Sequence, residues 1–131
     1  MCLFCDIAQH RISSDIVYED QYVLAFLDIN PISKGHTLII PKKHYDDFNE
    51  ISSELVARIH GISKRLVKKY DLTLKPDGYN FLSNAKEIAG QSIFHVHFHL
   101  IPRYQNGDGL DLHFHPSIDY KLNEIERNQL K

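Results

Sequence analysis

Three histidines at alternating positions, His95, His97 and His99, are the residues of this chain best suited to chemistry. An unperturbed imidazole has a pKa of about 6.5, so histidine can act as a nucleophile, acid, base or metal ligand near neutral pH. The residues between them, Val96 and Phe98, are apolar and are typical of a β-strand. Successive side chains of a strand point to opposite faces, so we expect the imidazoles on one face and the apolar residues against a core.

A single metal ion held by all three histidines does not fit this geometry. With a rise of about 3.3 Å per residue, the outer two rings lie about 13 Å apart along the strand, whereas a Zn–N bond is only about 2.1 Å long. One or two of the rings can still be ligands, and the others then have another task. The alternative without chemistry is a polar face of an edge strand that carries histidines by accident.

Two further groups lie outside this strand. Cys2 and Cys5 have the spacing that commonly supplies half of a tetrahedral zinc site. The alternatives are a pair of buried apolar cysteines and a redox pair, which fits less well because the motif opens the chain instead of following a strand in a βαβ unit. The segment 89–92, Ala-Gly-Gln-Ser, can present backbone N–H groups and a hydroxyl to a phosphate, although alone it is only a turn into a strand.

The bulk composition limits the classes of function. The 131 residues suffice for one domain, and 43% hydrophobic with 24% charged residues is ordinary for a soluble globular protein. A net charge of −2 argues against binding to nucleic-acid backbones, while a small phosphate ester remains possible. No basic N-terminal region precedes an apolar stretch, and no run is long enough to span a membrane, so a cytoplasmic protein is expected.

The elements that must position these residues follow from periodicity. Strands are expected at 15–18, 22–27, 36–40, 79–83 and 95–101, with Pro41 stopping the third. One long helix, spanning about 51–70, carries an apolar stripe; its residues are Ile51, Leu55, Ile59, Ile62, Leu66 and Tyr70. Ser52 or Ser53 can cap its start, Lys68 and Lys69 are expected in its last turn, and Gly61 predicts a close approach of another segment.

We therefore predict an α+β fold: a five-stranded antiparallel sheet with one long helix and short terminal helices. The first short helix is expected at 3–8 and a weak last one at about 119–129. Residues 1–110 are expected to form the domain, and 111–131 a C-terminal tail with a possible short helix.

The motifs taken together resemble the histidine triad (HIT) superfamily. The segment 95–101 has the family pattern His-φ-His-φ-His-φ-φ, where φ is an apolar residue. Upstream segments at 25–28, 34–36, 40–44 and 90–92 also resemble motifs of the family. The resemblance spans about residues 2–105 and is nearest to the bacterial Hint-like branch, which has an N-terminal Cys-x-x-Cys zinc site.

This resemblance implies a nucleoside phosphoramidase that cleaves the bond between an adenylyl or guanylyl group and an amine or other leaving group. His97 would be the nucleophile and form a nucleotidylated intermediate that water hydrolyses. His99 and His36 would contact the phosphate or move a proton, and Ser92 and Asn84 would donate hydrogen bonds.

The resemblance also implies the binding sites. The purine nucleotide pocket would comprise Leu3, Phe4, Phe26, Leu27, Asp28, Ile29, Asn84, Gly90 and Gln91. One structural zinc ion per chain would be held by Cys2, Cys5, His44 and His95, and no organic cofactor is implied. Members of this branch are usually homodimers joined through the long helix and a sheet edge.

Two features depart from the family pattern. Where many relatives have Asn-x-Gly, this chain has Asn84-Ala85-Lys86, and lysine incurs a penalty if the position requires a positive φ. The tail after Gly109 has no recognisable counterpart, so the leaving-group preference does not transfer. The alternatives are a diadenosine polyphosphate hydrolase of the same superfamily and a non-catalytic zinc- or nucleotide-binding module.

Overall fold

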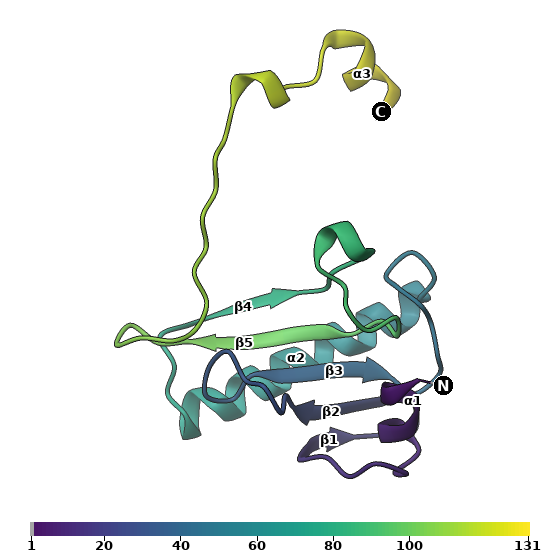
Figure 1. Cartoon of the computed structure of the whole chain (residues 1–131), viewed down its shortest axis with the longest axis vertical. Coiled ribbons are helices and arrows are strands. Elements are labelled where there is room, and N and C mark those ends of the chain that lie inside the picture. The colour runs from purple at the N-terminus through teal and green to yellow at the C-terminus, as the bar shows by residue number, and fades with distance from the viewer. Residues whose placement is uncertain (1) are drawn as a thin grey trace.

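A computed structural model describes residues 2–131 of the chain (Figure 1). The helices are α1 (Leu3–Ala8), α2 (Ser53–Thr73) and α3 (Glu124–Gln129), with short 3₁₀ turns η1 (Glu87–Ala89) and η2 (Ile118–Tyr120). The strands are β1 (Ile16–Glu19), β2 (Val23–Leu27), β3 (Thr37–Pro41), β4 (Gly78–Leu82) and β5 (Phe98–Arg103).

The five strands form one sheet in the order β1-β2-β3-β5-β4, and every neighbouring pair is antiparallel. Short connections join β1, β2 and β3, whereas α2 carries the chain across the sheet from β3 to β4. The predicted α+β architecture is therefore confirmed. The register places His99 of β5 opposite Leu38 of β3 on one side and Leu82 of β4 on the other.

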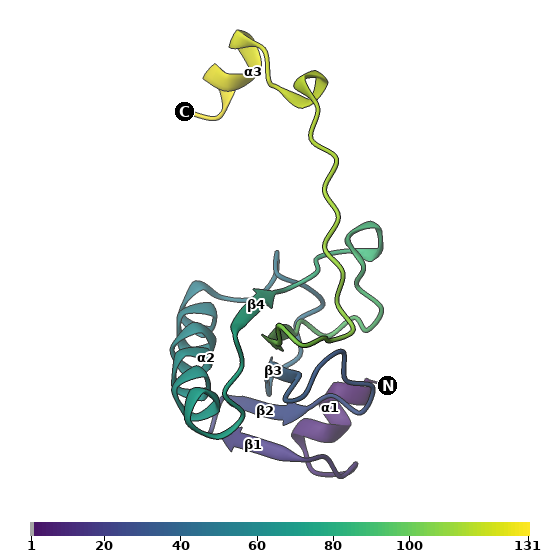
Figure 2. The same ribbon diagram turned by 90° about the vertical axis from the view of Figure 1, so that its left-hand side faces the viewer.

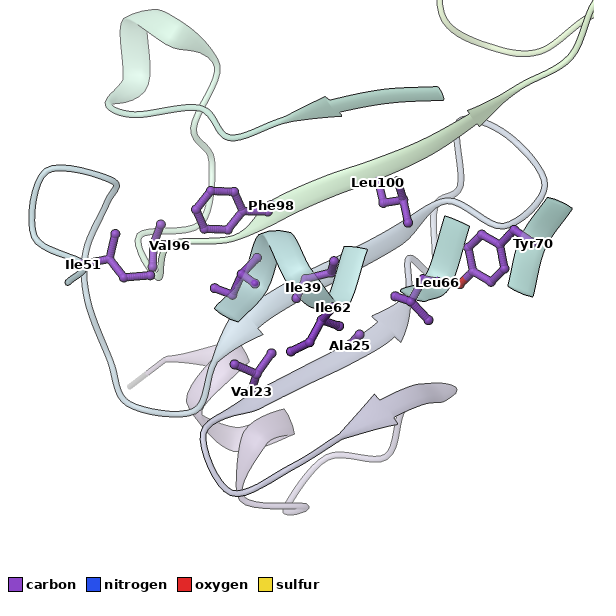
Figure 3. Packing of buried hydrophobic residues seen from close by; sticks show 11 residues of the cluster. Val23, Ala25, Ile39, Ile51, Ile62, Leu66, Tyr70, Val96, Phe98 and Leu100 are labelled. Carbon is purple, nitrogen blue, oxygen red and sulfur yellow. The ribbon is translucent and has the colours of Figure 1, made fainter. Parts of the chain in front are cut away.

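The main core lies between α2 and one face of the sheet (Figures 2 and 3). Its buried residues are Val23, Ala25, Ile39, Ile51, Ile59, Ile62, Leu66, Tyr70, Val96, Phe98 and Leu100. The helix begins where predicted, because the Ser52 hydroxyl accepts the N–H of Leu55 at 3.3 Å. Burial of this stripe anchors the sheet, and the opposite face remains available for α1 and the site.

The opposite face of the sheet is covered in part by α1. A second buried cluster joins the two elements, comprising Phe4, Ile7, Ala8, Leu24, Phe26, Leu38 and Ile40. Alternate residues of β2 and β3 thus enter opposite cores, as strand geometry requires.

The histidine strand is shorter than predicted. β5 begins at Phe98, so His95 and His97 lie in an irregular segment just before it. The reason is a different backbone partner: Val96 donates its N–H to the carbonyl of Tyr45 at 2.7 Å, in the loop after β3. The alternation of faces nevertheless holds, because Val96 and Phe98 are buried in the α2 core.

Three smaller expectations are wrong. The third strand does end at Pro41, but it includes this proline and so extends one residue beyond the expected 40, because a proline at a strand end forfeits only one hydrogen bond. α2 continues to Thr73, so Lys68 and Lys69 lie before its last turn. No atom lies within 4 Å of where a Cβ on Gly61 would stand, so nothing approaches the helix there.

The expected weak helix at 119–129 is two separate turns, η2 and α3. Within residues 2–131, none of the helices is both long enough and apolar enough to cross a membrane.

Candidate active site and metal centre

The triad histidines lie on the sheet face that also carries α1. His36 directly precedes β3, His99 belongs to β5, and the two strands are neighbours in the sheet. His97 lies two residues before His99, on the same face. The ring of Phe4 from α1 packs edge-on against the His97 ring, with 5.1 Å between centroids. His36, His95 and His97 are all buried. Three segments distant in sequence, α1, the start of β3 and residues 95–99, therefore build one compact cluster.

The proton of the His97 ring is positioned by the backbone. Its Nδ1 lies 2.9 Å from the carbonyl oxygen of His95. Because a carbonyl can only accept, Nδ1 carries the hydrogen and Nε2 keeps a free lone pair. Burial lowers the pKa of His97 below its ordinary value, so the ring is neutral at pH 7. This arrangement fixes the tautomer that a nucleophilic imidazole needs.

A chain of hydrogen bonds determines the protons of His36 and His99 in the same way. The backbone N–H of Ile32 donates to Nδ1 of His36 at 3.2 Å, so the hydrogen of His36 stands on Nε2. That Nε2–H donates to Nδ1 of His99 at 2.9 Å. His99 therefore carries its own hydrogen on Nε2.

His99 is also held neutral. Burial, with the neighbouring His97 and His36 rings, lowers the pKa of His99 to about 4. Its ring lies 5.0 Å from that of His97 between centroids. Two neighbouring rings thus differ in role: His97 has a free lone pair on Nε2, and His99 carries a hydrogen on Nε2.

Asp28 belongs to the same cluster. Its Oδ2 lies 3.8 Å from Nε2 of His36, and its Oδ1 accepts the N–H of Asn30 at 2.9 Å. Asp28, His36 and His99 are close enough to hold a cation. The tautomers oppose this, because the Nε2 of His36 carries a hydrogen and the Nδ1 of His99 already accepts it. These three groups are better suited to an organic ligand with hydroxyl and phosphate oxygens.

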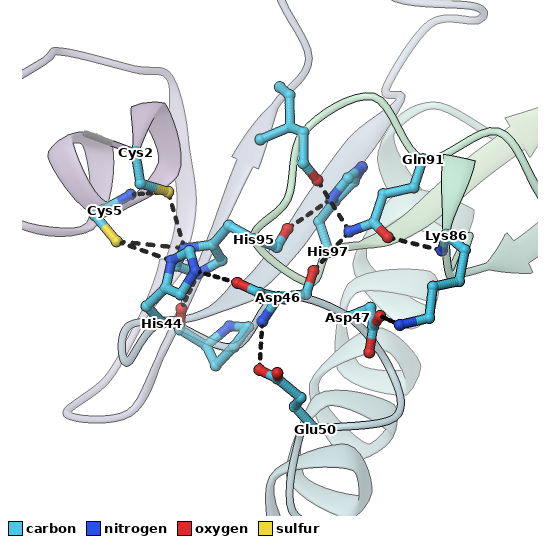
Figure 4. Close-up of polar contacts among 12 residues, drawn as sticks. Cys2, Cys5, His44, Asp46, Asp47, Glu50, Lys86, Gln91, His95 and His97 are labelled. Carbon is cyan, nitrogen blue, oxygen red and sulfur yellow. Dashed lines mark hydrogen bonds and ion pairs between the residues drawn. The ribbon is translucent and has the colours of Figure 1, made fainter.

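The predicted metal ligands come together at the N-terminus (Figure 4). One donor atom from each of Cys2, Cys5, His44 and His95 lies within 4.8 Å of all the others. The sulfur–nitrogen distances are 3.3 Å from Cys2 to His95, 3.4 Å from Cys5 to His44 and 3.5 Å from Cys5 to His95. Zn–S and Zn–N bonds at tetrahedral angles place sulfur and nitrogen about 3.5 Å apart. The four side chains therefore have the spacing of a closed tetrahedral zinc site.

The outer partners of these ligands fit a metal as well. Each histidine turns Nδ1 inward and uses Nε2–H outside the cluster, His95 to the carbonyl of Pro41 and His44 to the carboxylate of Asp46, both at 2.8 Å. Such partners orient ligating imidazoles in known metal sites. Burial and the neighbouring Cys2 raise the pKa of the Cys5 thiol to about 11, because two thiolates repel each other. A divalent cation between them removes that penalty.

The two sites share one residue. His95 contributes its ring to the metal ligands and its carbonyl to Nδ1 of His97. A metal that fixes the His95 ring also restrains the peptide that orients the His97 ring.

The segment 84–92 beside the triad is tied to the loop that follows β3. The Gln91 side chain accepts the N–H of Lys86 at 2.9 Å and donates to the carbonyls of Asp46 and Ile93 at 2.6 and 3.1 Å. It is buried and fully engaged, so its amide fastens two loops and is not free for a phosphate. Ser92 is exposed.

Lys86 has φ of +79°, so the departure from the family pattern falls where a glycine fits better. Its ammonium lies 2.6 Å from the carboxylate of Asp47. Gly90, at φ +102°, packs against the half-buried Asn84, so an added Cβ there would lie 3.3 Å from the Asn84 amide.

The residues expected to form the nucleotide pocket differ in exposure. Phe4 and Phe26 are buried against each other, with ring centroids 5.6 Å apart, and Phe4 also packs against His97. Leu27 and Asp28 are half-buried, whereas Leu3 and Ile29 are 46% and 87% exposed. The exposed pair can cover a flat ligand without disturbing the core.

The comparisons with known proteins agree with this geometry. A protein-family model described as HIT domain matches residues 9–106. The chain belongs to the HIT family. An uncharacterized HIT-like protein of Methanocaldococcus jannaschii is 48% identical over 128 residues, which are 95% of this chain and 95% of that protein. The adenosine 5′-monophosphoramidase of Schizosaccharomyces pombe is 42% identical over 125 residues, which are 95% of this chain and 90% of that protein.

Solved structures show the same HIT fold. A crystal structure of a HIT family protein from Bacillus anthracis superposes with a TM-score of 0.90 at 39% identity, covering 98% of this chain and 92% of that one.

Several residues that organise this HIT site were missed by sequence reasoning. The Ser83 hydroxyl donates to the carbonyl of His97 at 2.8 Å, and Ile32 and Pro41 act only through backbone atoms. Backbone groups are the same at every residue, so no residue type signals them. Ser83 stands at the end of β4, and only the β4–β5 pairing brings it to His97.

Proposed function

We propose that this protein hydrolyses conjugates of a purine nucleoside 5′-monophosphoryl group, adenylyl or guanylyl, with an amine or a similar leaving group. The observation that carries this proposal is the fixed Nε2 lone pair of His97 in a ring whose neighbour, His99, has its hydrogen on Nε2; the ring centroids lie 5.0 Å apart. An accessible lone pair and an adjacent donor are what nucleophilic displacement at phosphorus requires. The similarity to an adenosine 5′-monophosphoramidase supports the same class of substrate.

The reaction would proceed in two displacements. In the first, Nε2 of His97 bonds to the α-phosphorus as the bond to the leaving nitrogen breaks. His99 donates a hydrogen bond to the departing group, and a proton from solvent completes the amine. In the second, water attacks the phosphorus, the neutral His97 imidazole leaves and one proton returns to solvent, which yields the nucleoside monophosphate.

The remaining site residues would bind the substrate. His36 would hold the His99 ring in its donor tautomer, and Ser92 and Asn84 would donate to phosphate oxygens or to the leaving group. Asp28 would accept the ribose hydroxyls, and apolar walls would enclose the base; these are Leu3, Phe4, Phe26, Leu27 and Ile29. The turn at Gly90 and Gln91 would contribute backbone N–H groups, because the Gln91 side chain is engaged.

Zinc would be structural in this scheme. With Cys2, Cys5, His44 and His95 as ligands, no coordination position remains open for substrate. We also propose a homodimer joined through α2 and the free edge of the sheet at β4.

Adenosine phosphoramidate tests the proposed activity directly. The purified protein is expected to release AMP from it, and to prefer it over a diadenosine polyphosphate when initial rates are compared at equal concentration. Binding of AMP without turnover would instead indicate a non-catalytic module. Faster cleavage of the diadenosine compound would assign the chain to the other hydrolase class.

The lowered pKa values of His97 and His99 predict that kcat/KM begins to fall at a lower pH than ordinary histidines would give. Burial lowers the pKa of both His97 and His99, the latter to about 4, so the neutral rings persist as the pH falls through 6.5. We expect the acid limb of kcat/KM to have its midpoint below 6.5. A pH–rate profile measures this. A midpoint at or above about 6.5 would contradict the neutral, buried cluster.

A further inference from the structure

A cavity of about 450 Å³ lies at the end of the sheet where β1 turns into β2 and β3 ends. Its walls come from the β1–β2 turn, the loop after β3 and the first turns of α2. None of its lining residues belongs to the histidine cluster or to the four candidate metal ligands. A cavity of this size suits a small organic molecule, because ligand pockets in proteins commonly enclose about 300–1,000 Å³.

The apolar surfaces of the cavity are held by the body of the protein. Tyr45 and Leu55 are half-buried and pack against the main core. The N–H of Tyr22 donates to Oδ1 of Asp20 at 2.7 Å, and the Tyr22 carbonyl accepts the N–H of Lys42 at 2.8 Å. The Tyr22 side chain is half exposed, so its ring stands free at the rim. The cavity therefore offers two aromatic rings and one aliphatic side chain to a flat ligand.

A cation lies over each of the two aromatic rings. The guanidinium carbon of Arg58 is 5.0 Å from the centroid of the Tyr22 ring, and Nζ of Lys43 is 5.4 Å from that of Tyr45. Within residues 2–131, Lys43 forms no ion pair, and the Arg58 side chain makes one hydrogen bond, from Nε to Asp20 at 3.1 Å. The ammonium of Lys43 and the two terminal nitrogens of Arg58 therefore keep N–H donors for an anion.

The charges on the lining also favour an anion. Three of the eight lining residues are cationic, and one, Glu54, carries a carboxylate. Lys42 pairs with Glu19 at 2.6 Å, and Arg58 pairs with Asp20. Neither of these two carboxylates belongs to the lining. The cavity is thus locally positive on a chain whose net charge is −2, so local charge selects the ligand.

The cavity borders the loop that supports the triad. Lys43 and Tyr45 flank His44, a candidate metal ligand. The carbonyl of Tyr45 accepts the N–H of Val96 at 2.7 Å, and Val96 stands between the first two triad histidines. A ligand that contacts Lys43 and Tyr45 therefore lies against a loop shared with the histidine site, although the two sites have no residue in common.

We propose that this cavity binds a small aromatic anion, a flat ring that carries a sulfonate, carboxylate or phosphate group. The ring lies against Tyr22, Tyr45 and Leu55, and the anionic group accepts hydrogen bonds from Lys43 and Arg58. An anion without a ring gains only the charged contacts, and a ring without a charge gains only the apolar ones. This site is separate from the proposed nucleotide pocket and does not rest on the proposed hydrolysis.

Nuclear magnetic resonance of the ¹⁵N-labelled full-length protein tests the proposal, with naphthalene-2-sulfonate as the probe. We expect the backbone amide signals of Tyr22, Lys43, Tyr45 and Leu55 to shift with one common dissociation constant. Two comparison compounds separate the ring from the charge. Neutral 2-naphthol and inorganic sulfate should each bind at these amides about tenfold more weakly or less, because each lacks one half of the recognised group.

Substitutions locate the anionic group. Lys43→Gln with Arg58→Gln should raise the dissociation constant for naphthalene-2-sulfonate about tenfold, because both donors to the anion are lost. The matched control, Lys64→Gln with Lys69→Gln, removes the same charge from exposed positions of α2 outside the lining and should leave the constant within about twofold.

Three results would overturn the proposal. The first is the absence of shifts at the four amides, and the second is equal affinity for 2-naphthol. The third is a dissociation constant that the Lys43 and Arg58 substitutions leave unchanged or alter no more than the control does. None of these measurements involves the release of AMP, so they stand or fall apart from the proposed hydrolase activity.

Discussion

Replacing His97 with glutamine is expected to lower the release of AMP from adenosine phosphoramidate by about 10³-fold or more. Glutamine keeps a polar group of similar size but offers no imidazole lone pair, so no covalent intermediate can form. Because the buried ring donates to the His95 carbonyl and touches Phe4, we also expect a moderate loss of stability. Single-turnover kinetics with the purified variant measure the first effect, and thermal unfolding separates it from the second.

The matched control for this variant is His113→Gln. His113 is also a histidine but is exposed in the C-terminal segment 111–131. Its replacement should leave the rate within about twofold. A His97→Gln protein that turns over at the rate of the unchanged chain would eliminate His97 as the nucleophile.

The second large effect is expected at the metal centre. Cys2→Ser with Cys5→Ser should reduce bound zinc from about one equivalent per chain to none, because the variant lacks both sulfur ligands. The free energy of unfolding should fall by about 3 kcal/mol or more, since structural zinc contributes directly to folding. The rate of AMP release should fall too, because His95 is a candidate metal ligand and its carbonyl also orients His97. Elemental analysis, chemical denaturation and the AMP assay measure the three effects.

A control for the metal variant lies in the same helix. Asp6→Asn alters a charged residue of α1 that pairs with Arg11 and is not a ligand, so zinc content should remain at one equivalent. If the unchanged protein binds no zinc, the assignment of the four ligands fails, whatever the variant does.

Much of the molecule could be predicted from residue types and their spacing. The apolar stripe of α2 and the alternation of Val96, Phe98 and Leu100 specify which faces are buried, because burial of apolar surface dominates the free energy of folding. The spacing of Cys2 and Cys5 indicates a pair that could hold a metal, and the structure brings His44 and His95 to it. The histidine pattern identifies the family.

The tertiary structure decided how these residues work. It moved the start of β5 to Phe98, engaged the amide of Gln91 between two loops, and left residues 111–131 exposed. It also selected the tautomers of the triad through Ile32, Pro41 and the carbonyl of His95. Sequence could not show this, because every residue carries the same backbone N–H and C=O groups. Which of them meets an imidazole depends only on how distant segments pack.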